Sequence, residues 1–337
     1  MSLDMSLALL GVSFIVVLAA AELFTNGIEW FGKRLQLAEG AVGSVLAAVG
    51  TALPETSIAI VAVVSGKATH DVGIGAILGA PMMLSTLAMF ITGLAVIIFA
   101  GSGVRKTEMT VDHEVLGRDL RAFFVVYIVA IGAAFVSWYP AKVAIAVFLV
   151  GAYVRYVKRT FGSNADSTGN HDLKPLHFHR AAQVPRFRVV TLQVAAGLAA
   201  IFVGAHLFVI SVKSVAESLG ISSLVLGLLI TPIATELPEK FNSITWVRQK
   251  KDTLALGNIS GAMVFQSSIT PAIGILFTPW ALTHDRAAMA SAIVAIVASI
   301  AAWAEITWRK RLSPYSLLVG GLFYAVYPVY VFGFCCR

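Results

Sequence analysis

The stretch GTALPETS, residues 50–57, places a proline and a glutamate inside a long apolar segment. A related stretch, ATELPEKF at residues 234–241, repeats the pair and adds a second carboxylate. Proline removes the helical hydrogen-bond partner of the carbonyl four residues before it, which predicts freed carbonyls at Gly50 and Ala234. Freed carbonyls beside carboxylates indicate a binding site for a hard cation.

The composition is typical of a membrane protein that crosses the bilayer several times. The chain has 337 residues, of which 58% are hydrophobic and 13% charged, whereas a soluble domain has about 25% charged residues. The net charge of +7 does not indicate nucleic-acid binding, because basic residues of membrane proteins collect in cytoplasmic loops. Cys335 and Cys336 are adjacent at the C-terminus and define neither a disulfide framework nor a metal-ligand spacing.

Polar breaks divide the chain into apolar segments long enough to cross a bilayer as helices. There are ten of them, at residues 5–30, 39–65, 72–100, 121–138, 140–157, 189–217, 221–247, 253–280, 286–308 and 314–334. Lysine and arginine residues collect in the loops on one side of the membrane, and this side is expected to be the cytoplasmic one. The pattern predicts an inner-membrane protein with both termini outside. Residues 1–158 and 189–337 are then two halves of five segments each, and residues 159–188 are a flexible cytoplasmic linker.

The two halves resemble each other in sequence. A shift of 184 residues places Thr51, Pro54 and Glu55 on Thr235, Pro238 and Glu239, and a shift of 182 places GAILGAP (75–81) on GNISGAM (257–263). Because five segments are an odd number, the second half enters the membrane upside down. We therefore expect an all-α membrane protein of ten transmembrane helices in two inverted five-helix repeats, an architecture of secondary transporters.

The repeated motifs also supply the candidate ligands. Thr51 and Glu55 share one helix face, as do Thr235 and Glu239, and Glu236 reaches the same side. Asn258 and Gln266 add amide oxygens from the following segment of the second half. The predicted cation ligands are therefore these seven side chains and the carbonyls of Gly50 and Ala234. Two glutamates at symmetry-related depths in apolar segments favour this reading over a pair of helix kinks, because a charge buried in a membrane is costly.

At these motifs the chain resembles the prokaryotic members of the sodium/calcium exchanger family, within the cation/calcium antiporter superfamily. The motif regions are residues 50–84 and 234–266. The resemblance implies ten helices in two inverted repeats and alternating access by sliding of the first and sixth helices. It also implies that Glu55 and Glu239 are the main carboxylates, with Thr51 and Thr235 beside them.

Several positions depart from the family pattern. Apolar residues replace expected oxygen ligands, three in the first half and one in the second, and a glutamate replaces a serine in the second. The positions concerned are Ala52, Ala80, Leu84, Glu236 and Ala262. The expected sodium sites are therefore incomplete.

The sequence thus predicts a secondary active antiporter that exchanges sodium for calcium, with calcium/proton exchange as the alternative. The transported ions are Ca²⁺ and either Na⁺ or H⁺. A channel is a further alternative, which the inverted repeats disfavour. An enzyme is not expected, since the chain has neither a His-Glu-x-x-His nor a Gly-x-Ser-x-Gly motif. Neither a cofactor nor a nucleic-acid or protein partner is expected, only inorganic cations and the lipid bilayer.

Overall fold

The computed structural model describes residues 2–35, 47–163, 174–180 and 184–335, with the side chains of residues 47–53, 161–163, 236–242, 284 and 334–335 outside the described set. The elements are almost all α-helices, and no strand occurs in these ranges. The α-helices are α1 (Leu3–Arg34), α3 (Ala47–Val64), α4 (His70–Met83), α5 (Met89–Gly101), α6 (His113–Gly132), α7 (Tyr139–Ser163), α8 (Phe187–Leu219), α9 (Ser223–Arg248), α10 (Asp252–Gln266), α11 (Ile269–Phe277), α12 (Arg286–Arg309) and α13 (Pro314–Tyr330). The π-helical turn η3 (Leu84–Ala88) joins α4 to α5, and the 3₁₀ turn η5 (His177–His179) precedes α8.

The helix ends follow from local capping. The side chain of Asp112 accepts the backbone N–H of Glu114 at 2.9 Å before α6. That of Asp285 accepts the N–H of Ala288 at 2.9 Å before α12. Such caps satisfy backbone donors that a helix leaves without partners. Gly220 ends α8 with φ of 66°, a conformation that glycine adopts without strain.

The expectation of an all-helical membrane protein is confirmed. Within the described residues, seven helices are long and apolar enough to cross a bilayer, and Pro54–Val64 and Ser223–Thr235 are shorter apolar stretches. Each expected apolar segment overlaps helical structure. The fourth differs most, because α6 begins at His113, so that Arg118 belongs to the helix and not to a loop. Ten crossings and their inverted repeats stay a prediction.

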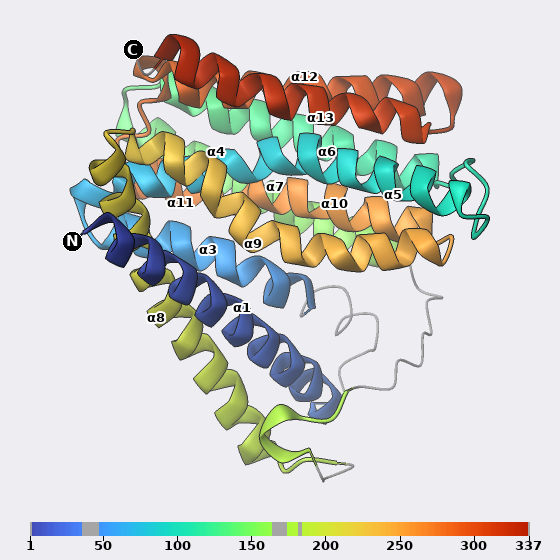
Figure 1. Ribbon diagram of the computed structural model, residues 1–337, viewed down its shortest axis with the longest axis horizontal. Helices are drawn as coiled ribbons and strands as arrows, with labels where there is room; N and C mark the ends of the chain where they lie inside the picture. Colours follow the sequence, from blue (N-terminus) through green and yellow to red (C-terminus); the bar gives the residue numbers. More distant parts are fainter. Residues whose placement is uncertain (1, 36–46, 164–173, 181–183, 336–337) are drawn as a thin grey trace.

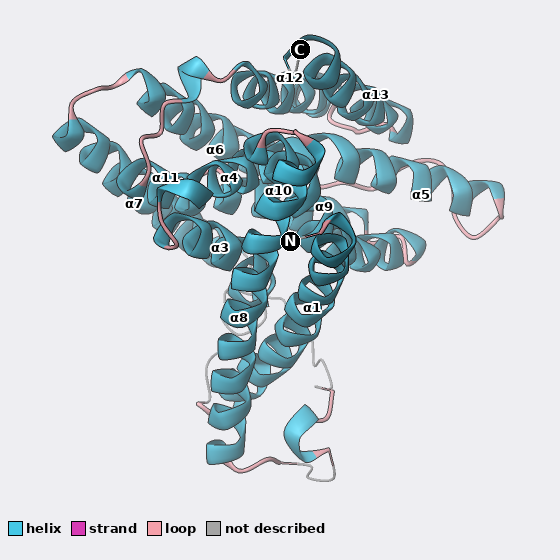
Figure 2. Cartoon of the chain, turned by 60° about the vertical axis from the view of Figure 1, so that its left-hand side comes forward, coloured by secondary structure: helices cyan, strands magenta, loops and turns pink. Residues whose placement is uncertain are grey.

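Helices α1 and α8 form a closely packed antiparallel pair, and their ends at Arg34 and Phe187 project from the remaining helices (Figures 1 and 2). Glycines permit the close approach. A Cβ atom at Gly197 would lie 2.9 Å from the Cα of Phe24, and one at Gly204 would lie 2.8 Å from Cγ2 of Val17. Small residues at a helix interface let backbones meet in this way.

Helices α4 and α9 also touch through their backbones. A Cβ atom at Gly79 would overlap the carbonyl oxygen of Leu228, and one at Gly227 would lie 2.9 Å from that of Val72. Helix α4 follows the helix that carries the first Pro-Glu motif, and α9 carries the second motif itself. Their contact therefore fixes the first half of the chain directly against the second.

We expect Gly79→Ala to destabilise the protein. The new methyl group meets the carbonyl oxygen of Leu228, so α4 and α9 must separate, and overpacking of this kind costs about 1–3 kcal/mol or more. Thermal melting in detergent measures the effect. Gly151→Ala in α7 is the matched control, because a Cβ atom there meets nothing within 4 Å. Equal melting temperatures for the two variants would contradict the close contact.

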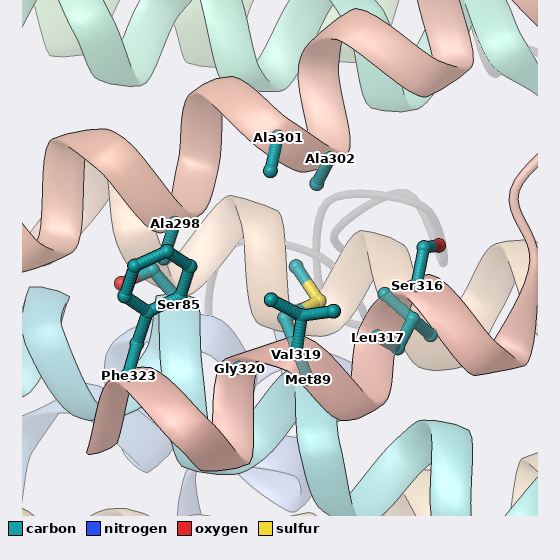
Figure 3. Close-up of a pocket in the computed structure, with 10 residues that line it drawn as sticks. All are labelled: Ser85, Met89, Ala298, Ala301, Ala302, Ser316, Leu317, Val319, Gly320 and Phe323. Atoms are coloured by element: carbon teal, nitrogen blue, oxygen red, sulfur yellow. The ribbon is translucent and has the colours of Figure 1, made fainter. Parts of the chain in front are cut away.

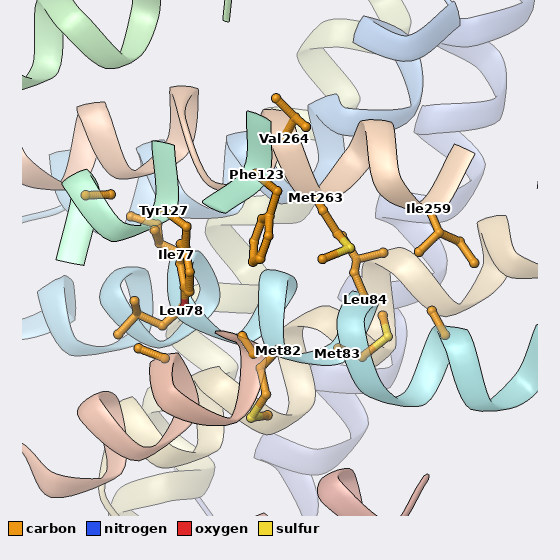
Figure 4. Close-up of a cluster of buried hydrophobic side chains, with 14 of the residues drawn as sticks. Ile77, Leu78, Met82, Met83, Leu84, Phe123, Tyr127, Ile259, Met263 and Val264 are labelled. Atoms are coloured by element: carbon orange, nitrogen blue, oxygen red, sulfur yellow. The ribbon is translucent and has the colours of Figure 1, made fainter. Parts of the chain in front are cut away.

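The largest hydrophobic core lies where α4 and η3 pack against α6 and α10 (Figure 4). Met83, Leu84, Phe123 and Met263 are fully buried there. This core surrounds the π-helical turn, which follows the proline of α4, Pro81. Bulges of this type occur frequently at functional sites.

Candidate functional site

Glu55 of α3 and Gln266 of α10 meet in the interior, although they are 211 residues apart in the sequence. Nε2 of Gln266 donates a hydrogen bond of 2.6 Å to Oε2 of Glu55. The two residues are only 5% and 1% exposed. A buried carboxylate requires hydrogen-bond partners or a cation, because the loss of hydration is otherwise costly. Two predicted ligands, one from each half of the chain, are thus in direct contact.

A break in the helix places Gln266 at its position. Helix α10 ends at this residue, and α11 begins at Ile269 after a change of backbone direction at Ser268, where φ is −121° and ψ is −66°. The hydroxyl of Thr270 donates to the carbonyl oxygen of Gln266 at 2.7 Å. The hydroxyl of Ser268 donates to the carbonyl of Val264 at 2.6 Å. Side chains therefore satisfy backbone carbonyls at the break, which leaves the Gln266 amide aimed at Glu55.

The first half places an apolar residue at the related position. Leu84, which aligns with Gln266 under the 182-residue shift, is fully buried in the core together with Met83 and Met263. Ala80 is 1% exposed. Neither side chain offers an oxygen to a cation. The two halves therefore contribute unequally to the site.

Thr235 is buried, as a ligand would be, and it lies in α9. Its hydroxyl donates to the carbonyl oxygen of Thr231 at 2.9 Å. A hydroxyl that donates its hydrogen still has lone pairs on its oxygen with which it can coordinate a cation. Pro232, one residue after Thr231, packs toward Gly79 of α4. Thr235 thus lies on a helix that is fixed against α4.

The other predicted ligands divide into two groups. The side chains of Thr51, Glu236 and Glu239, and the surroundings of Gly50, lie outside the described residues. Ala234 is buried in α9, and Asn258 is half-buried in α10. Asn258 lies eight residues before Gln266, about 12 Å along the helix axis. No hydrogen bond of Asn258 to Glu55 or Gln266 occurs among the described contacts, and its role as a ligand stays a prediction.

Among the described side chains no group of three or more His, Cys, Asp or Glu residues is arranged for a metal ion. The two glutamates of the second motif are not in that set. A small cavity lies elsewhere, between η3, α12 and α13 (Figure 3), and Ser85 and Ser316 are its polar lining residues. It does not include Glu55 or Gln266.

Glu22 and His206, which the repeat relates, do not form an interhelical pair. Glu22 is largely exposed, and its Oε1 lies 3.8 Å from Nε2 of His177 in the linker. His206 is exposed on α8.

Two buried polar clusters were not predicted. Arg105 and Asp252 form a bidentate ion pair, with N–O distances of 2.5 and 2.8 Å, that joins the segment after α5 to the start of α10. Asp119 of α6 accepts the hydroxyl of Ser260 of α10 at 2.8 Å. Both pairs connect the first half of the chain to the second. The only sequence signal was an acidic residue in each basic or apolar stretch.

A match to a protein-family model identifies the class of the chain. The model of a family described as sodium/calcium exchanger protein matches residues 5–161 and 189–335. By class, then, the protein is an integral membrane cation exchanger. It belongs to the sodium/calcium exchanger protein family.

Individual relatives are distant in sequence but similar over most of their length. The chain is 25% identical over 314 residues to "Inner membrane protein YrbG" of Escherichia coli (strain K12), with 91% of this chain and 90% of the relative covered. It is 23% identical over 273 residues to "Putative antiporter CaxA" of Alkalimonas amylolytica, with 80% and 79% covered.

Two solved structures share the fold. A structure of the H⁺/Ca²⁺ exchanger CAX superposes with a TM-score of 0.74 at 15% identity, covering 97% of this chain and 86% of that one. A structure of the sodium-calcium exchanger NCX_Mj superposes with a TM-score of 0.58 at 20% identity, covering 99% and 100%. At these identities the likeness concerns the fold.

Proposed function

We propose that the protein is an antiporter that moves Ca²⁺ in exchange for protons. The carrying observation is the burial of Leu84 in the hydrophobic core, at the position that the repeat relates to Gln266. A sodium ion requires a shell of oxygen ligands, whereas a proton requires only one carboxylate. Replacement of oxygen ligands by Leu84 and Ala80 therefore affects sodium sites more than proton binding.

The proposed exchange occurs at Glu55. Its carboxylate accepts a hydrogen bond from Nε2 of Gln266. A cation between these residues needs oxygen ligands, and rotation of the amide by half a turn presents Oε1 of Gln266. Glu239, Glu236 and the hydroxyl of Thr235 would complete the set from α9, because Ca²⁺ takes six to eight oxygens. Protonation of the carboxylates removes the charge that holds the cation, so the two ions compete.

The proposed transport architecture has ten crossings in two inverted repeats, with both termini outside and the linker in the cytoplasm. The contact of Glu55 with Gln266 supports an ion site at which residues of both repeats lie side by side. The projecting α1–α8 pair supports alternating access, in which this pair slides along the other helices. Neither a chemical reaction nor a cofactor is part of this proposal.

Sodium coupling is the second candidate. Gln266 retains an amide oxygen beside Glu55, and the hydroxyl oxygen of Thr235 is also available. The family resemblance of the two Pro-Glu motifs favours the same ion. The buried Leu84 and Ala80 offer no oxygen at the related positions of the first half, which is why protons are the first choice.

Calcium flux into vesicles that contain the purified protein separates the candidates. We expect vesicles with an acidic interior to accumulate Ca²⁺ from an alkaline, sodium-free medium, and sodium-loaded vesicles at equal pH on both sides to accumulate little. Sodium-driven uptake without a response to the pH gradient would establish the second candidate instead. Calcium equilibration without either gradient would indicate a channel.

A further inference from the structure

Ser267 lies at the break between α10 and α11, directly after Gln266, and its side chain is fully buried. Among the described contacts its hydroxyl has no hydrogen-bond partner. The hydroxyls that follow it along the chain are satisfied, since those of Ser268 and Thr270 donate to backbone carbonyls. Burial of a hydroxyl that makes no hydrogen bond costs its hydration without a return. Such an atom beside a functional site therefore indicates a group that binds there.

The backbone at the break determines where the side chain of Ser267 is directed. Its N–H still donates to the carbonyl oxygen of Met263 at 3.0 Å, so Ser267 belongs to the last turn of α10. Residues four apart in a helix share a face, and successive residues are about 100° apart around the axis. The side chain of Ser267 therefore leaves the helix on the face of Met263, next to the face of Gln266.

These two faces of α10 meet the first half of the chain. Met263 packs in the same core as Leu84 of η3 (Figure 4). Gln266 meets Glu55 of α3. Helix α11, which follows the break, packs against both α3 and α4. Ser267 is therefore directed toward the junction of α3 and α4, beside the Gln266–Glu55 pair.

The related serine of the first half has a different role. The 182-residue shift places Ser85 on Ser267. The hydroxyl of Ser85 donates to the carbonyl oxygen of Met82 at 3.1 Å, and the residue lines the cavity between η3, α12 and α13 (Figure 3). This cavity is separate from the ion site. The second half thus places a hydroxyl beside the site where the first half does not.

We propose that the hydroxyl oxygen of Ser267 is a ligand of the transported Ca²⁺ at the Glu55 site. This assignment rests on the proposed antiport. Ca²⁺ takes six to eight oxygens and accepts neutral ones beside carboxylates. A serine needs only a change of its single χ angle to turn its oxygen toward a cation on the neighbouring residue. The neutral side-chain ligands then come from the second half, and Ser267 offsets part of the oxygens that the first half lacks.

The first test removes the oxygen. Ser267→Ala is compared with Ser291→Ala in α12, because Ser291 is equally buried and its hydroxyl donates to the carbonyl oxygen of Ala288 at 2.8 Å. Calcium affinity is measured as the rise in melting temperature of the full-length protein in detergent titrated with Ca²⁺. We expect about tenfold weaker binding in Ser267→Ala, since even a residue that only orients a metal ligand contributes this much. The control should bind Ca²⁺ like the natural protein, and unchanged affinity in Ser267→Ala would overturn the proposal.

A cysteine variant separates coordination from packing. Ser267→Cys replaces a hard oxygen by a soft sulfur, and sulfur ligands favour softer metal ions such as Cd²⁺. The ratio of the Cd²⁺ affinity to the Ca²⁺ affinity should rise about tenfold or more in this variant and stay unchanged in Ser291→Cys. The terminal cysteines, Cys335 and Cys336, are present in every variant, so their contribution cancels. An unchanged ratio in Ser267→Cys would mean that Ser267 acts only by packing, and the proposal would be wrong. If Ser267→Ala does not fold, the cysteine variant decides alone.

The same titrations separate this ligand from the proposed exchange itself. Calcium binding that is lost in Glu55→Gln but unchanged in both Ser267 variants would refute only the assignment of Ser267. A natural protein that Ca²⁺ does not stabilise, and that gives no calcium flux under either gradient, would refute the antiport and the ligand together.

Discussion

Replacement of Glu55 by glutamine should abolish calcium exchange while the protein stays folded. The substitution removes the negative charge of the buried first-half carboxylate but keeps a side chain that can hydrogen-bond to Gln266. A divalent cation then faces one charge fewer at its site. We expect its affinity to fall at least about a hundredfold, or about 2.7 kcal/mol. Calcium-dependent stabilisation against heat and the vesicle flux both measure this loss.

Glu22→Gln provides the matched control, since Glu22 carries the same group on the surface of α1 and faces His177. Its calcium affinity should equal that of the natural protein. A Glu55→Gln variant with unchanged flux would show that Glu55 is not part of the ion site. An unfolded variant would show instead that the carboxylate is needed for stability, which the melting curve distinguishes.

Loss of the Arg105–Asp252 ion pair should cause the largest loss of stability. Arg105 is 7% exposed, and besides Asp252 it contacts the carbonyl oxygens of Val247 and Glu108 at 2.8 and 3.0 Å. Asp252→Ala leaves its guanidinium buried without the carboxylate, which costs about 3–5 kcal/mol. We expect a large fall in melting temperature.

The exposed pair of Lys213 and Glu217 is the control for this effect, with an N–O distance of 3.7 Å. Glu217→Ala should change the stability by about 1 kcal/mol or less, because solvent screens such pairs. In addition, Arg105→Leu combined with Asp252→Leu should be less destabilising than either single substitution, since no buried charge is left alone. A small effect of Asp252→Ala would mean that the pair contributes little.

The sequence predicted those parts of the molecule that depend on apolar patterns and on repeated motifs. Apolar length located the helices, and the repeated Pro-Glu motifs directed attention to Glu55 and Gln266, which the structure brings into contact. It failed where a pairing depends on tertiary structure alone. Asp252 follows two lysines in a turn, and nothing local indicates that its partner is Arg105, 147 residues away.

The order of the segment Lys174–Arg180 was missed for a related reason. Its sequence, KPLHFHR at residues 174–180, has neither helical nor strand periodicity, and its order comes from side chains of α1 and α8. The same limit applies to Gly79, whose role as a contact with α9 requires knowledge of the neighbouring helix. The composition indicated a linker at residues 174–180 and a packing glycine at Gly79. It did not indicate which residues they contact.

The contact between α4 and α9 has a consequence for biosynthesis. Gly79 lies before the linker and its neighbour Leu228 lies after it, so the ribosome makes the two surfaces about 150 residues apart. The pairs of α1 with α8, α5 with α13 and α6 with α10 also join an early helix to a late one. The early helices therefore enter the membrane with their small-residue faces still uncovered. Assembly has to wait until most of the chain has been translated, and a nascent chain truncated at the linker has no partner for these faces.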